Sequence, residues 1–157
     1  LVSGFQSQAG GDPDALRAAL TQAFGGKASA GQIEQLAQQI LAGDTPMPAN
    51  IEFVEAESLG ATNYGAYDPQ DGGTIYLDAR LLDKPALLQD VFNEELGHHL
   101  DSVLGGDDAR GDEGAIFSQA LTEGVLDQKT LQQLQLEQDH GYIEVDGEQV
   151  AVEFRNE

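Results

Sequence analysis

Apolar residues in the first third of the chain recur at helical spacing and predict two helices. The first begins at Asp12-Pro13, a capping residue followed by a proline suited to the first helical turn, and is stopped by Gly25-Gly26. The second begins at Ser29 and is stopped by Gly43. Residues 1–11 are small and polar, and a frayed lead-in is expected there. The segment 1–48 is therefore predicted to be a helical subdomain or a pro-segment.

The pattern then changes to short runs typical of β-strands. Strands are predicted at Ile51 to Val54, at Asn63 to Tyr67 and at Thr74 to Leu77, with a Gly-containing turn before the last. Alternating apolar residues from Gly141 to Phe154 surround Asp146-Gly147, a strong hairpin signal.

A long helix is predicted between these strands and that hairpin, from Pro85 to Leu104. Its apolar stripe consists of Leu88, Phe92, Leu96, Leu100 and Val103. Shorter helices are expected after two capping residues: one capped by Asp112 that carries Ile116 to Leu121, and a polar one capped by Asp127 around Leu131 and Leu134. Together these elements predict an α+β fold: a small antiparallel or mixed sheet, one long helix, an N-terminal helical segment and a C-terminal β-hairpin. Residues 49–157 would form the main domain.

Composition narrows the classes of function. The chain of 157 residues carries 7 Lys+Arg against 28 Asp+Glu, a net charge of −21, so nucleic acid and anionic membranes are not expected partners. Metal ions or basic peptides are the expected partners of so acidic a chain. There is no cysteine, which excludes thiolate zinc sites and cysteine nucleophiles. No apolar run is long enough to cross a bilayer, and no membrane insertion is expected. An acidic, Gly-rich, Cys-free chain fits bacterial secretion or the cell surface, and equally a cytoplasmic protein.

The candidate chemistry lies in the second half of the long helix. Glu94 and His98 share one face because they are four residues apart, and Asp101 follows one turn later, so the three are expected to look outward. A carboxylate and an imidazole at this spacing can chelate a divalent metal, and Glu95 beside them could take a proton from a metal-bound water. His99 falls on the apolar stripe and is interpreted as a satisfied histidine at the edge of the core.

Two simpler interpretations stay open. The carboxylates around His98 could form a solvated acidic face in a very acidic chain. The stretch from Gly105 to Glu113 could bind calcium, but its spacing does not match an EF-hand, and a plain acidic loop is the preferred interpretation.

The residues 94–98, Glu-Glu-Leu-Gly-His, resemble the zincin metallopeptidase motif His-Glu-x-x-His, with Glu in place of the first His. The strand from Gly73 to Leu77 is similar to the edge strand that precedes the zincin active-site helix. Together with the stretch from Gly111 to Phe117, the motif resembles a module of large secreted bacterial proteins, many of which carry hemolysin-type calcium-binding repeats. The resemblance covers roughly Asn63 to Phe154 and implies a zincin-like fold.

The resemblance also implies roles for individual residues. Glu94 and His98 would be metal ligands, and Glu95 the general base. The third ligand would come from downstream, with Glu113 the first choice, then Asp112 and Asp101. Asp101 could instead accept a hydrogen bond that orients His98.

Two further roles concern the substrate. His140, just before the C-terminal hairpin, could stabilise an oxyanion, or it could be a surface histidine that caps a turn. The strand Thr74 to Leu77 would hold an extended peptide or protein substrate by strand addition.

The expected function is metal-dependent hydrolysis of peptide bonds, with self-processing of the parent chain included. Zinc is the first expectation for the metal. Because a Glu ligand adds negative charge and oxygen-rich sites also suit other cations, manganese, iron and calcium are alternatives. The competing hypotheses are a non-catalytic calcium- or metal-binding structural or adhesion module, and a domain that binds a basic protein through charge. A monomer, or a module of a larger chain, is expected.

Overall fold

The computed structural model describes residues 1–60, 63–105, 113–135, 140–145 and 148–154. Within these residues the fold is α+β, with six α-helices, three short 3₁₀-helices and five strands. The helices are α1 (Val2–Gly11), α2 (Pro13–Phe24), α3 (Ala30–Leu41), α4 (Pro85–Leu104), α5 (Glu113–Glu123) and α6 (Gln128–Gln135). The strands are β1 (Asn50–Val54), β2 (Gly65–Asp68), β3 (Thr74–Asp78), β4 (His140–Val145) and β5 (Glu148–Phe154). The 3₁₀-helices are η1 (Ala56–Leu59), η2 (Gln70–Gly72) and η3 (Ala79–Asp83).

The sheet is mixed, with strand order β1-β3-β2-β5-β4. β1 runs parallel to β3, and the other neighbours are antiparallel. Within the described residues, the hairpin β4–β5 joins the rest of the sheet at β2 through two residue pairs, Ala66 with Phe154 and Tyr67 with Glu153. The predicted α+β class, the long helix and the C-terminal hairpin are confirmed, while a zincin-like fold stays a prediction.

The prediction that Thr74 to Leu77 is an edge strand is wrong. β3 lies between β1 and β2, so neither of its edges is open to a peptide. The physical reason is its apolar character on both faces: Ile75 and Leu77 are fully buried on one side, and Tyr76 is buried on the other. A strand that is apolar on both faces belongs in the interior of a sheet. The open edge on this side belongs to β1.

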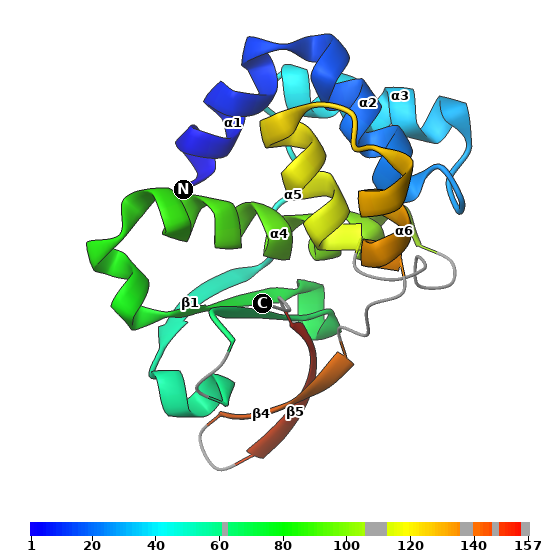
Figure 1. Cartoon of the computed structure of the whole chain (residues 1–157). Coiled ribbons are helices and arrows are strands. Elements are labelled where there is room, and N and C mark those ends of the chain that lie inside the picture. The colour runs from blue at the N-terminus through cyan, green and yellow to red at the C-terminus, as the bar shows by residue number, and fades with distance from the viewer. Residues whose placement is uncertain (61–62, 106–112, 136–139, 146–147, 155–157) are drawn as a thin grey trace.

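Helix α4 lies between the sheet and the other helices (Figure 1). Helices α2 and α3 begin at the predicted residues. Asp12 accepts a hydrogen bond from the Ala15 amide at 3.1 Å at the start of α2, and Ser29 and Gln32 form a capping box at the start of α3. The frayed lead-in predicted for 1–11 is wrong. That segment is helical because Phe5 and Ala9, one turn apart, are both fully buried.

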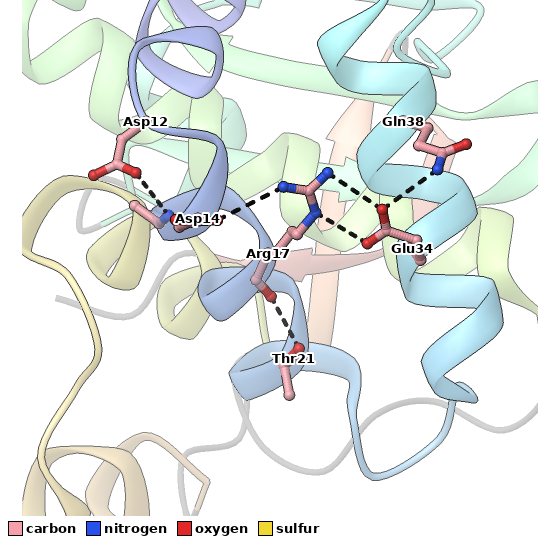
Figure 2. Close-up of polar contacts among 7 residues, drawn as sticks. Asp12, Asp14, Arg17, Thr21, Glu34 and Gln38 are labelled. Carbon is pink, nitrogen blue, oxygen red and sulfur yellow. Dashed lines mark hydrogen bonds and ion pairs between the residues drawn. The ribbon is translucent and has the colours of Figure 1, made fainter.

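Helices α2 and α3 are also joined on the surface by a two-pronged ion pair (Figure 2). Nε and Nη2 of Arg17 donate to the two carboxylate oxygens of Glu34 at 3.0 and 3.2 Å. The hydrogen bond from Arg17 holds the pKa of Glu34 below its ordinary value. Asp14 adds a longer contact of 3.7 Å to the same guanidinium. Because this pair is exposed, it contributes little to the packing of the two helices.

The N-terminal helices share one hydrophobic core with α4 and α5. The ring of Phe117 in α5 lies 6.1 Å from that of Phe5 and 6.2 Å from that of Phe24, measured between centroids. A second, smaller cluster lies between β2–β3, η1 and the hairpin. A domain boundary at residue 48 stays a prediction, but the helices before it are packed into the core that carries α4. None of the helices in the described ranges is long and apolar enough to cross a membrane.

Candidate functional site

Helices α4 and α5 meet through two glycines. A Cβ atom on Gly97 would lie 2.9 Å from the Cα of Gly114. A Cβ on Gly114 would lie 2.4 Å from the main-chain oxygen of Glu94 and 2.7 Å from Nε2 of His98. The two backbones therefore approach as closely as side-chain-free residues permit, and the first turn of α5 is set directly against the candidate motif.

This crossing brings Glu113 onto His98. Nδ1 of His98 and Oε1 of Glu113 are 2.9 Å apart, and both side chains are fully buried. Burial raises the pKa of Glu113 above its ordinary value; the hydrogen bond and charge of His98 offset part of this, and the nearby Asp101 carboxylate adds to it. Among the described residues, the second carboxylate oxygen of Glu113 has no hydrogen-bond partner. Glu113, the first choice for the third metal ligand, thus lies beside His98, the predicted second ligand.

The face of α4 that was expected to look outward is buried. Glu94 is 8 % exposed, His98 1 % and Asp101 3 %, so the interpretation as a solvated acidic face is also wrong. The cause is the cover supplied by α5 and by the connection between α2 and α3. From that connection, Nζ of Lys27 makes an ion pair of 2.6 Å with Oδ1 of Asp101 and donates to its main-chain oxygen at 3.1 Å.

Glu95 lies on the side of α4 that faces the sheet. It is fully buried, and its Cγ would be 3.1 Å from a Cβ placed on Gly65, the first residue of β2. The absence of a side chain at Gly65 therefore lets β2 lie directly over Glu95. Since Glu95 and His98 are three residues apart on one helix, the candidate base stays next to the candidate ligand while it packs against a different element.

The interpretation of His99 as a satisfied histidine at the edge of the core is confirmed. It is 5 % exposed, and its Nδ1 is 2.8 Å from the hydroxyl of Tyr67. Burial lowers the pKa of His99, and a hydrogen bond to the main chain of Met47 opposes part of that effect. The partner, Tyr67, was missed by the sequence reasoning. Its place opposite Ile75 in the alternating pattern of β2 and β3 was the available signal.

Two predicted site residues are not located by the structure. Asp112 lies outside the described residues. His140 is the first residue of β4, but its side chain is outside the described part of the chain. Their roles as a third ligand and as an oxyanion donor therefore stay predictions.

The donor types gathered here, carboxylates and an imidazole, fit a divalent cation. Their arrangement is less complete: within residues 1–60, 63–105 and the other described ranges, no group of three His, Asp or Glu side chains is placed to hold one ion. The hydrogen bond between His98 and Glu113 already occupies Nδ1 and Oε1, the two atoms that would bind such an ion.

A scan against protein-family models, a search of curated proteins and a search of solved structures each found no match for this chain. Support for any function therefore comes from the side chains of the chain itself.

Proposed function

We propose that this chain is a metal-dependent peptidase in which Glu94, His98 and Glu113 would close around a divalent metal as it binds, with zinc the first candidate, because their side chains are not placed to share one ion beforehand. The observation that carries the proposal is the return of Glu113 to His98 across fifteen residues of chain, at 2.9 Å and without contact to solvent. Carboxylates and imidazoles that are buried together in proteins are ion-paired, hydrogen-bonded or metal-bound.

The role of each residue follows from its surroundings. His98 and Glu113 would hold the cation in place of the hydrogen bond that now joins Nδ1 and Oε1. When bound, a zinc-type ion supplies a Lewis acid and an acidified water. Glu95 lies next to the ligand helix face and under β2, where it would accept a proton from that water. Lys27 holds Asp101 in an ion pair, so Asp101 is assigned to the support of the cluster rather than to the metal.

Elemental analysis of the purified protein, paired with cleavage of an unfolded protein substrate, tests this proposal. We expect stoichiometric metal in the wild type, loss of the metal in His98→Ala, and at least about tenfold lower affinity in Glu113→Gln, because removal of a ligand costs no less than removal of a residue that only orients one. Glu95→Gln should keep the metal and lose about 10²–10⁴-fold in cleavage rate. The matched control is Glu123→Gln, an exposed carboxylate at the other end of α5, which should behave as wild type. A wild-type protein that binds no transition metal would refute the proposal.

A second candidate is a non-catalytic module that binds a cation for stability. Burial of the whole cluster favours it, because Glu94, His98 and Glu113 are at most 8 % exposed and a substrate must reach the metal in a peptidase. In this case calcium or another divalent ion should raise the melting temperature while Glu95→Gln leaves metal binding unchanged and no cleavage is seen in either protein. The same pair of measurements therefore separates the two functions.

A further inference from the structure

Strand β1 forms an open edge of the sheet. Within the described residues its one partner strand is β3, and four of its five residues are exposed. Two of these are large and apolar: Ile51 is 37 % exposed and Phe53 41 %. Exposed edge strands with apolar residues are usually shortened, twisted away or covered in proteins, because they invite pairing with another chain.

The two apolar residues continue a buried layer. In the parallel register, Ile51 lies beside Ile75 and Phe53 beside Leu77, and both β3 residues are fully buried on the α4 side of the sheet. Ile51 and Phe53 therefore extend that layer to the outer strand of the sheet. A further strand beside β1 would bury them with apolar residues of its own.

The opposite face and the surroundings of this edge are acidic. Glu52 points to the other face of the sheet from Ile51, because side chains alternate along a strand. Asp44, Glu52, Glu55 and Glu57 are all exposed. No Lys or Arg occurs in the sequence between Lys27 and Arg80, a stretch that contains β1, β2 and β3. Arg80, the next basic residue along the chain, makes an ion pair with Asp78 and also lies near Glu57, so the carboxylates that a strand placed beside β1 would meet are those of Glu52 and Glu55.

We propose that β1 is a docking edge for an extended, basic segment of a partner protein, which adds to the sheet as a further strand. Its apolar residues lie next to Ile51 and Phe53, and its Lys or Arg residues lie next to Glu52, since opposite charges on neighbouring strands attract. A second copy of this chain is a poorer occupant because each copy carries a net charge of −21 and would bring its own Glu52 to the pairing. This inference goes beyond the proposed peptidase and does not depend on it.

The test uses a fluorescent ten-residue peptide that alternates Val and Lys, with binding measured by fluorescence anisotropy. The wild type should bind it, and should not bind a peptide that alternates Val and Glu. N-methylation of alternate backbone nitrogens on the pairing edge should weaken binding at least tenfold, because it removes main-chain hydrogen bonds and leaves the charge intact. Glu52→Lys and Phe53→Ser should each weaken binding at least tenfold. Both replaced residues are exposed, and a thermal melt checks that each variant is folded.

Matched controls separate a strand site from general charge attraction. Glu123→Lys makes the same change of charge on α5, and Tyr142→Ser removes an exposed aromatic residue, 71 % accessible, from the other outer strand, β4. Both should bind the peptide as the wild type does. Equal weakening by Glu123→Lys, or no effect of N-methylation, would overturn the proposal. So would sedimentation that shows a wild-type dimer abolished by Phe53→Ser, since a second copy would then be the occupant.

Discussion

Replacement of Gly114 by Ala tests the crossing on which the candidate site depends. The new Cβ would lie 2.4 Å from the main-chain oxygen of Glu94 and 2.7 and 2.8 Å from Nε2 and Cδ2 of His98. A side chain can rotate away, but the oxygen belongs to the backbone of α4 and can move only with the helix. Overpacking of this kind costs about 1–3 kcal/mol. Alanine returns about 1 kcal/mol of helix propensity over glycine, so a net loss of up to about 2 kcal/mol is expected.

For a chain of this length, a loss of about 2 kcal/mol corresponds to a fall in melting temperature of roughly 4–8 °C. Chemical unfolding in urea, followed by circular dichroism, measures the loss in free energy of unfolding directly. The matched control is Gly31→Ala in α3, where the nearest atom to the added Cβ is 3.9 Å away and a small gain in stability is expected. Equal stability of the Gly114→Ala and Gly31→Ala proteins would refute the close crossing. If the peptidase proposal also holds, Gly114→Ala should weaken metal binding, because His98 must move.

Two further predictions concern buried titratable groups. Burial lowers the pKa of His99 in the folded protein below the ordinary value of 6.5, so its contribution to stability is present above that pH and is lost as the pH falls through the folded pKa. Urea unfolding between pH 7.5 and 5 should therefore show a free energy of unfolding that falls with pH less steeply in His99→Gln than in the wild type. An equal slope in the two proteins would contradict the assignment. Lys27→Met removes the ion pair with Asp101 and should cost roughly 1.5–3 kcal/mol, whereas Lys129→Met on the exposed face of α6 should cost almost nothing. A double-mutant cycle of Lys27→Met with Asp101→Asn should give a coupling of at least about 1 kcal/mol, and additive effects would show that the pair is not formed.

Most helices and strands were predictable because their signals are local. Asp12-Pro13 and Ser29 mark helix starts through hydrogen bonds to residues three positions away, and these bonds are present. The hairpin was predictable from the alternation of apolar residues on both sides of Asp146-Gly147 in the sequence. The segment before Asp12 was not, because its helix depends on Phe5 reaching Phe117, a contact that no local pattern records.

The order of the strands could not be predicted from the local pattern, because it also depends on contacts between distant residues. A run such as Thr-Ile-Tyr-Leu is compatible with an edge or an interior position, and the choice depends on which other strand pairs with it. The parallel pairing of β1 with β3 joins residues that are 24 apart in the chain, as Asn50 with Thr74 shows. The apolar residues on both faces of β3 were the one available indication, and they favour the interior.

The burial of Glu94, His98 and Asp101 shows what helical periodicity can and cannot establish. Periodicity assigns residues to faces, and it placed these three together and opposite the apolar stripe, which is the arrangement found. It assumes that a polar face meets water, and that assumption fails when a second helix packs on it. Here the second helix can approach because Gly97 meets Gly114, and it supplies a carboxylate for His98 at the same crossing. The sequence signal for this buried polar contact was therefore the pair Gly97 and Gly114. They lie on consecutive predicted helices, beside acidic residues and a histidine. A polar helix face that carries glycine at its centre is better interpreted as a site of close packing than as a surface.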